Sequence, residues 1–320
     1  MCHAVHFQIL FVSHSKRGTL NSIPYNIPVS KEKQQMMFLK PPSATLPISL
    51  IAAVLAMTSG CGNKAVQPEV PAPLPIQKAE QRPSVTPPHL ANFVASTKDF
   101  YLSPKPQKRV ALTFDAGSDD KAVKLILEEL AKHKVHATFF LTGKFCEKFP
   151  EAVKEIADAG MEIGNHSYSH PQFTKLTDEE IREQLSRAEE AIHKSTGKSA
   201  KPLFRFPYGA RDKRSTTVVA EEGYQSIYWY VDSLDSVGKP KTAEFIAERV
   251  IEKLVEGGIS LMHVSSIPSA EALPRIFEHL EKEGLTVVPV SELLGDWQVA
   301  EREKQEKRLA REEAKKRSAK

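Results

Sequence analysis

Regular alternation between short apolar runs and helical patterns, beginning at Arg109, constrains the fold more than any other feature of this chain. The apolar runs that predict strands lie at residues 109–114, 137–142, 162–165, 202–206, 225–231, 259–264 and 285–290. Helical patterns lie between them, for example at residues 119–132, 151–159, 178–194, 242–256 and 270–283. Thr177 and Glu180 form a capping-box pattern at the start of the third of these helices. Alternation of this kind predicts parallel strands joined by crossover helices. Seven units within about 190 residues favour a small or incomplete (β/α) barrel, and periodicity alone leaves an open sheet as the alternative.

Composition argues against several classes of protein. The 320 residues carry a formal net charge of +4, and the expected folded region has no basic stripe interleaved with aromatic residues, so nothing indicates nucleic-acid binding. The three cysteines, Cys2, Cys61 and Cys146, form no C-x-x-C pair, which argues against a zinc ribbon or a redox motif. These features do not reveal the oligomeric state.

Residues 36–60 have the layout of a signal peptide. Lys40 supplies positive charge, and an uncharged apolar run at residues 46–57 is too short to span a bilayer as a stable helix. Residues 58–61 read T-S-G-C and resemble a bacterial lipobox, with Thr58 where Leu is usual. Lipidation of Cys61 would anchor the exported chain to the outer face of the cell membrane. The alternative is an ordinary cleaved signal and a secreted protein.

The remaining boundaries follow from composition. Residues 1–35 precede an expected start at Met36 or Met37 and contain no recognisable element. Residues 61–106 are rich in proline and poor in large apolar side chains, which predicts an extended tether. Residues 107–298 form the expected folded domain. Residues 299–320 hold nine Lys/Arg against five Glu, which predicts a solvated helix or frayed tail, or else a basic contact to anionic wall polymer or lipid headgroups.

Polar side chains with catalytic potential lie at or just after the expected strands. They are Asp115, His166, Tyr208, Asp232 and His263. In a β/α barrel the carboxyl ends of the strands form the active-site face, so we expect these side chains to converge. His166 and His170 are four residues apart, and a helical turn there would bring both rings to one side, where they could bind one metal. Zinc is the first expectation, with cobalt, nickel or manganese as alternatives.

Five short motifs occur in a fixed order along the folded region. They are T-F-D-A-G (113–117), H-S-Y-S-H-P (166–171), R-F-P-Y-G (205–209), D-S-L-D (232–235) and L-M-H (261–263). Their order and spacing resemble those of the NodB-type polysaccharide deacetylases, carbohydrate esterase family four. The resemblance implies a distorted, incomplete (β/α) barrel of the NodB homology type over residues 107–298. It also implies metal-dependent removal of N-acetyl groups from a cell-wall or related polysaccharide such as peptidoglycan.

The resemblance also implies roles for the motif residues. Asp115 would be the catalytic base, and Arg205 would pair with it and keep it ionised. His166 and His170 would hold the metal, which lowers the pKa of a bound water.

The remaining implied roles concern the substrate. The backbone N–H of Tyr208, which follows Pro207 in its motif, would stabilise the oxyanion. His263 would protonate the leaving amine, and either Asp232 or Asp235 would raise its pKa. Leu261 would pack under the acetyl methyl group.

Two departures from the family pattern stand out. Ser236 follows the fourth motif where the family often has Trp, and Ala116 stands where the family has a metal-binding Asp. With Ala116, a water could fill the gap, Asp115 could move onto the metal, or the metal could be lost. Asp119 and Asp120 lie nearby, although they equally suit a helix N-terminus. The alternatives to a deacetylase are therefore a catalytically impaired glycan-binding lipoprotein and an esterase acting on O-acetylated polysaccharide.

Overall fold

The computed structural model describes residues 90, 93–105 and 107–318. The predictions for residues 1–35, for the signal peptide at 36–60, for Cys61 and for most of the tether lie outside the described residues. Within the described part of the chain, no helix is both long enough and apolar enough to cross a membrane.

The described domain is built on one eight-stranded sheet whose strand pairs are all parallel. Its strands are β1 (Arg109–Ala116), β2 (Thr138–Leu141), β3 (Glu162–Asn165), β4 (Leu203–Phe204), β5 (Gln225–Ser226), β6 (Val231–Asp232), β7 (Ile259–His263) and β8 (Thr286–Val287). They are ordered β5-β4-β3-β2-β1-β7-β6, and β8 pairs with β1. No pairing joins β5 to β6 among the described strands, so the curled sheet is an incomplete barrel, as predicted.

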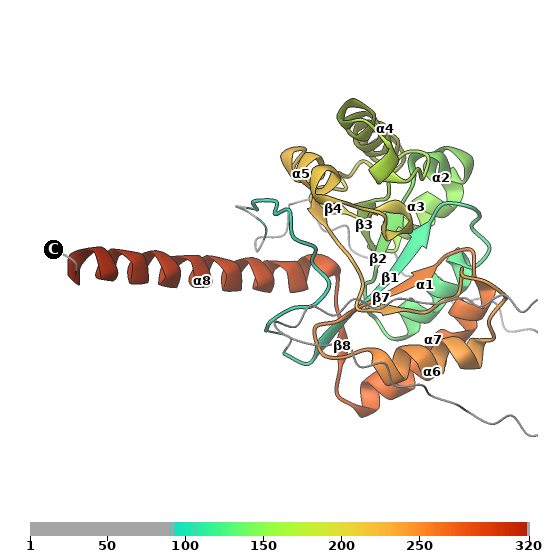
Figure 1. Ribbon diagram of the computed structural model, residues 1–320. Helices are drawn as coiled ribbons and strands as arrows, with labels where there is room; N and C mark the ends of the chain where they lie inside the picture. The colour runs from blue at the N-terminus through green and yellow to red at the C-terminus, as the bar shows by residue number, and fades with distance from the viewer. Residues whose placement is uncertain (1–89, 91–92, 106, 319–320) are drawn as a thin grey trace, which may run out of the picture. The chain divides into compact units, whose positions relative to one another are not determined.

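The helices lie outside the sheet, with β1 and β7 side by side near its centre (Figure 1). They are α1 (Val123–Lys132), α2 (Gly143–Lys148), α3 (Pro150–Asp158), α4 (Asp178–Thr196), α5 (Lys213–Glu221), α6 (Ala243–Lys253), α7 (Ile267–Lys282) and α8 (Val290–Ser318). The capping box of α4 is present: Thr177 Oγ1 accepts from the Glu180 N–H at 3.2 Å, and the Glu180 carboxylate accepts from the Thr177 N–H at 2.8 Å.

Several predicted elements need correction. The single strand expected at 225–231 is two short strands, β5 and β6. They are separate because β5 pairs with β4 at one end of the strand order, whereas β6 pairs with β7 at the other end. The strand expected at 285–290 pairs only at 286–287, and from Val290 the chain is already helical and continues into the predicted tail. The helices α2 and α5 were not predicted; both are short, with their apolar residues too few to set up a clear period.

Along β1, alternate side chains face the apolar core and the candidate site. Val110, Leu112, Phe114 and Ala116 are fully buried in the large apolar cluster that includes residues of α1 and α7. Thr113 and Asp115 therefore point to the opposite face, inside the curl of the sheet. Phe114 stacks on Phe139 with ring centroids 5.1 Å apart, and a truncation to Ala there would cost about 3–5 kcal/mol. The strand that presents Asp115 is thus held by pairing with β2, β7 and β8 and by its side chains in the apolar cluster.

Candidate active site

Asp115 and Arg205 form a buried ion pair at the end of β1. Arg205 Nη1 donates to Asp115 Oδ1 at 2.7 Å and to Thr113 Oγ1 at 2.8 Å, and the arginine side chain is fully buried. Burial raises the pKa of Asp115, but the charges of Arg205, His166 and His263 and the Arg205 hydrogen bond outweigh it and hold the pKa below the ordinary value. The carboxylate is therefore ionised at neutral pH and can accept a proton.

Arg205 is fixed from several sides. Its Nε donates to the carbonyl oxygen of Ile227 at 3.2 Å, and its guanidinium lies over the Phe140 ring, 4.1 Å from the centroid. Its Nη2 is buried and has no hydrogen-bond partner among the described groups. A buried N–H group without a partner is costly, so this nitrogen marks a place where a water or a substrate oxygen would bind favourably.

His166 and His170 bring two ring nitrogens together beside this pair. His166 Nδ1 donates to the carbonyl oxygen of Arg205 at 2.8 Å, and because a carbonyl can only accept, His166 Nε2 is left with a free lone pair. That Nε2 lies 3.2 Å from His170 Nε2 and 3.4 Å from Asp115 Oδ2. Two nitrogens bound to one tetrahedral zinc ion are about 3.3 Å apart, so the imidazole pair fits a metal as two ligands.

Both imidazoles are neutral at neutral pH. Burial lowers the pKa of His166 against the opposing charge of Asp115. Burial, followed by the neighbouring His166, lowers the pKa of His170 to about 4. A neutral imidazole is the form that binds a metal.

The reason offered from the sequence for this juxtaposition is wrong. The segment after β3 is not a helical turn; it reverses through Ser167 and His170, whose φ angles are 70° and 62°. Asn165 Oδ1 accepts from the Ser167 N–H at 2.8 Å, and Ser167 Oγ accepts from the His170 N–H at 3.0 Å. These side-chain bonds, rather than a four-residue helical period, bring the two rings together.

His263 ends β7 and is the register partner of Asp115 on β1. Its Nδ1 donates to Asp235 Oδ1 at 2.7 Å, and its backbone N–H donates to Asp235 Oδ2 at 2.8 Å. Burial lowers the pKa of His263, but the hydrogen bond and charge of Asp235, together with Asp115 and Asp232, raise it above the ordinary value. Asp235 is thus the partner that the sequence left undecided, whereas Asp232 Oδ1 accepts from the Leu234 N–H at 2.8 Å in the turn after β6.

Tyr208 lies in a short 3-10 turn, Pro207–Gly209, with a φ of 59° that few non-glycine residues adopt. Its side chain is 66% exposed, and its ring edge lies against His170, with centroids 4.5 Å apart. Pro207 is buried beneath it, and Leu261 is buried on β7. Ser236 Oγ lies 3.4 Å from His263 Nε2, so a hydroxyl borders the imidazole where the family pattern would place a ring.

Ala116 is the last residue of β1. Its methyl group is fully buried and belongs to the apolar cluster. Asp119 pairs with Lys121 at 2.8 Å, and Asp120 accepts the Val123 N–H through its backbone carbonyl at 3.0 Å. Across the described residues, no group of three or more His, Cys, Asp and Glu could hold a metal ion. Among the described residues, the site therefore offers a metal the two imidazoles and no complete set of three ligands.

Two contacts of the site were missed from the sequence. Thr113 shares the face of Asp115 because it lies two residues before it, a period that was readable in the strand. Ser269 Oγ donates to Asp235 Oδ2 at 2.6 Å from the first turn of α7. The pattern Ser266-x-x-Ser269 signals a helix start, but the approach of that start to Asp235 depends on tertiary structure.

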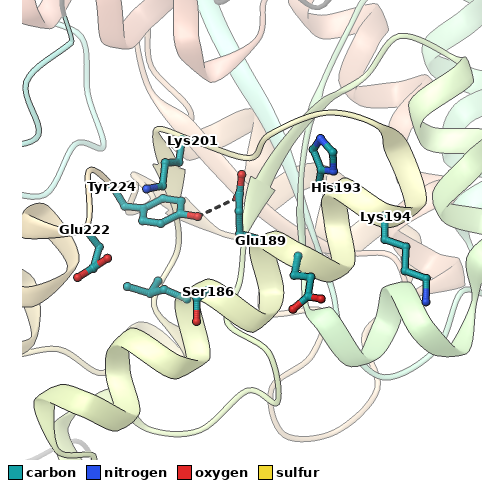
Figure 2. A pocket seen from close by; sticks show the side chains of 9 residues that line it. Ser186, Glu189, His193, Lys194, Lys201, Glu222 and Tyr224 are labelled. Atoms are coloured by element: carbon teal, nitrogen blue, oxygen red, sulfur yellow. Dashed lines mark hydrogen bonds between the residues drawn. The ribbon is translucent and has the colours of Figure 1, made fainter.

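Two hollows on the described surface lie away from these residues. One, of about 550 Å³, lies along α4 and includes Glu189, whose carboxylate accepts from the Tyr224 hydroxyl at 2.8 Å (Figure 2). The other, of about 940 Å³, lies between residues 94–98 and α8. None of the predicted site residues lines either hollow. We place the chemistry at the strand ends, because the convergent acid, base and imidazole pair are there.

Comparison with known proteins identifies the family. The family model described as polysaccharide deacetylase matches residues 103–227. The peptidoglycan-N-acetylglucosamine deacetylase of Bacillus cereus is 36% identical over 217 residues, which are 66% of this chain and 76% of that protein. The chain belongs to the polysaccharide deacetylase family. The peptidoglycan-N-acetylmuramic acid deacetylase PdaA of Bacillus subtilis is 29% identical over 248 residues, 77% of this chain and 94% of that protein.

Solved structures of this family support the fold. The structure of PdaA, a family 4 carbohydrate esterase, matches with a TM-score of 0.59 and 33% identity over 62% of this chain and 85% of that one. BA3943 from Bacillus anthracis matches with a TM-score of 0.58 and 34% identity over 62% of this chain and 69% of that one, and it is a pseudoenzyme of the same family. A mutant of BA3943 has restored enzymatic activity. This polysaccharide deacetylase therefore has both catalysts and a non-catalytic protein among its structural neighbours.

Proposed function

We propose that this polysaccharide deacetylase removes N-acetyl groups from peptidoglycan or a related N-acetylated glycan. The observation that carries the proposal is the pairing of Asp115 and His263 as register partners on neighbouring strands. Arg205 lowers the pKa of Asp115 and keeps it ionised, and Asp235 raises the pKa of His263 and favours its protonated form. A base and an acid on adjacent strand ends are what hydrolysis of an amide requires.

Asp115 and His263 carry out the two proton transfers of the reaction. Asp115 accepts a proton from the attacking water as the water oxygen bonds to the acetyl carbonyl carbon. The backbone N–H of Tyr208 stabilises the oxyanion, and Leu261 packs against the acetyl methyl group. His263 donates its Nε2 proton to the sugar nitrogen as the C–N bond breaks, which releases acetate and the amine. One proton enters Asp115 and one leaves His263, so exchange with solvent restores both groups.

Members of this family generally depend on a divalent metal, and in this chain His166 and His170 would hold it. Such an ion would polarise the acetyl carbonyl and lower the pKa of water, and zinc is the first candidate, with cobalt, nickel or manganese as alternatives. We further propose that Ala116 takes the position of the second carboxylate of the family's first motif. The metal is then held by fewer protein ligands than the three usual at a catalytic zinc, which predicts weak binding.

The test is release of free amine from N-acetylated sugar oligomers and from peptidoglycan, with the metal-loaded full-length chain. Asp115→Asn should abolish release. Asp119→Asn is the matched control, because Asp119 carries the same group in the segment just after β1 but pairs with Lys121. O-acetylated polysaccharide tested in parallel separates an esterase from an amidase. Absence of amine release with every one of the four metals would refute the proposal.

A second function is favoured by Ala116 and by the lack of a three-ligand metal group among the described residues. In this alternative the protein binds an N-acetylated glycan without hydrolysing it. Asp115→Asn should then leave the affinity for glycan and the cellular phenotype unchanged, whereas loss of both with that substitution would favour the enzyme.

Export and anchoring remain predictions. The signal peptide at 36–60 and lipidated Cys61 would place the domain 107–298 at the outer face of the cell membrane, with residues 61–106 as its tether. The charged tail at 299–320 is not needed for this placement. Mass spectrometry of the mature N-terminus decides this, since a free and unmodified Cys61 would exclude the anchor.

A further inference from the structure

The exposed part of α8 carries its charges in an asymmetric pattern. From residue 299 onward this helix is largely exposed, and Figure 1 shows it as one continuous helix. Five of its cations are spaced by three, one, three and four residues, so at about 100° per residue they fall within an arc of about 100°. We name these residues the basic stripe: Lys304, Lys307, Arg308, Arg311 and Lys315. The five glutamates of the same segment lie outside that arc.

The basic stripe continues the face by which α8 packs on the domain. Leu293 is buried on that face, and Trp297 packs against Phe100 with ring centroids 5.5 Å apart. Lys304 and Arg308 follow Trp297 by seven and eleven residues, spacings that keep all three on one side of the helix, so apolar contacts give way to cations along one line. The cations therefore face the side where the helix meets the rest of the domain.

That side is concave. The hollow of about 940 Å³ between residues 94–98 and α8 is lined by four of the five stripe residues and by Lys98. Its acidic residues are already engaged: Glu301 pairs with Lys98 at 3.0 Å, and Glu303 pairs with Lys105 at 3.0 Å. The hollow is left with an excess of positive charge.

Most of the basic stripe is available to a ligand. In the part of the chain that the structure describes, no carboxylate forms an ion pair with Lys307, Arg311 or Lys315. Arg308 Nε lies 3.8 Å from Glu312, and Lys304 Nζ lies 3.6 Å from Glu301. Exposed pairs at these distances are weak and yield readily to a stronger anion.

We propose that the basic stripe binds a linear polyol-phosphate polymer, that is, a chain with a phosphodiester in every repeat. Lys and Arg are the side chains that bind phosphate oxygens, and the stripe offers them over about 16 Å of helix. A concave surface admits a chain but not a flat bilayer, and the stripe has no apolar residue to insert among lipids. The stripe itself has no aromatic residue, and Trp297, which lines the hollow, is already packed on Phe100, which disfavours stacking of single-stranded nucleic acid.

The experiment compares two triple variants of the full-length chain in binding soluble poly(glycerol phosphate) at 50 mM salt. Lys307→Gln/Arg308→Gln/Arg311→Gln removes three charges from the stripe. Lys316→Gln/Arg317→Gln/Lys320→Gln is the matched control, because it removes three charges that follow the stripe in the sequence, and Lys316 and Arg317 do not line the hollow. An exposed charge contact contributes a factor of about 1.5 to 5, so the stripe variant should bind about tenfold more weakly, and the control less than about threefold. Binding should weaken as salt rises.

Four outcomes would overturn the proposal. They are no binding of poly(glycerol phosphate) by the unaltered chain, equal losses in the two variants, tighter binding to vesicles containing phosphatidylglycerol, and tighter binding to single-stranded nucleic acid. Sedimentation of the unaltered chain alone adds a fifth, since self-association lost only in the stripe variant would assign the surface to a second copy. Deacetylation of soluble oligomers should be the same in both variants, which separates this proposal from the catalytic one.

Discussion

Replacing Arg205 by Met should leave the Asp115 carboxylate buried without its partner. The arginine supplies the hydrogen bond at 2.7 Å to Asp115 and a second at 2.8 Å to Thr113, in a fully buried site. Removing one member of a buried ion pair costs about 3–5 kcal/mol. Loss of the unpartnered Nη2 group offsets about 1 kcal/mol of that. We therefore expect the free energy of unfolding to fall by about 2–4 kcal/mol at pH 7.

The pH dependence of this loss gives the sharper test. In the unaltered protein the pKa of Asp115 lies below its ordinary value of 3.8, so the ion pair stabilises the fold above that pH and ceases to as pH falls through the folded pKa. Without Arg205, burial is the dominant influence and raises the pKa of this carboxyl group. The folded variant then binds the proton more tightly than the unfolded chain, and its stability falls as pH rises, by at most about 1.4 kcal/mol per pH unit.

The assay is urea unfolding followed by circular dichroism from pH 4.5 to 8, with a chelator present. The difference between the two proteins should be small at pH 4.5 and largest at pH 8. Adding Asp115→Asn to Arg205→Met removes the carboxyl group, so the double variant should show a difference that no longer varies with pH. A loss below about 1 kcal/mol at pH 7, or one that is flat with pH in the single variant, would refute the reasoning.

Three further predictions concern the acid, the metal and a helix cap. Asp235→Asn should lower the pKa of His263, because the Asp235 carboxylate raises it. The alkaline limb of the profile of kcat against pH should therefore move to lower pH, with a loss of kcat of about tenfold or more at pH 8. An unmoved limb would exclude His263 as the acid. Ala116→Asp should tighten zinc binding at least about tenfold in calorimetry, because it adds a third ligand; unchanged affinity with lower stability would refute position 116 as that of the missing ligand. Thr177→Ala should remove the capping box of α4 and cost about 1 kcal/mol, a fall of about 2–4 °C in Tm, whereas Lys175→Ala, just before the cap, should change Tm little.

The sequence predicts the secondary structure correctly where the elements are long and strongly periodic. β1, α4 and β7 lie close to where their patterns predict them, because burial of one face imposes a clear period. The split of residues 225–231 into β5 and β6 was not predictable, since both strands are two residues long and are defined by different neighbours in the sheet. Pairing of that kind is tertiary information.

The candidate site, too, could be predicted from the sequence only in part. The residue types and the motif order were sufficient to predict Asp115, Arg205 and His263 as neighbours. The choice of Asp235 over Asp232 was not available, because it depends on how the turn after β6 folds back toward the start of α7. The imidazole pair was expected from a helical period and is instead produced by two residues with positive φ, a local conformation that propensity does not predict for Ser or His.

Because Asp115 and His263 are register partners on adjacent strands, the loops around them can vary while the spacing between the two residues stays fixed. Adjacent strands lie about 4.8 Å apart, and backbone hydrogen bonds maintain that spacing, so the distance between the two groups is a property of the sheet and not of any loop. Insertions after β1 or β7 can remodel the surface that meets a new polymer while the proton-transfer geometry stays constant. Deleting a single residue within β7 has the opposite effect: it turns His263 to the other face of the sheet and ends its chemistry while leaving every loop in place.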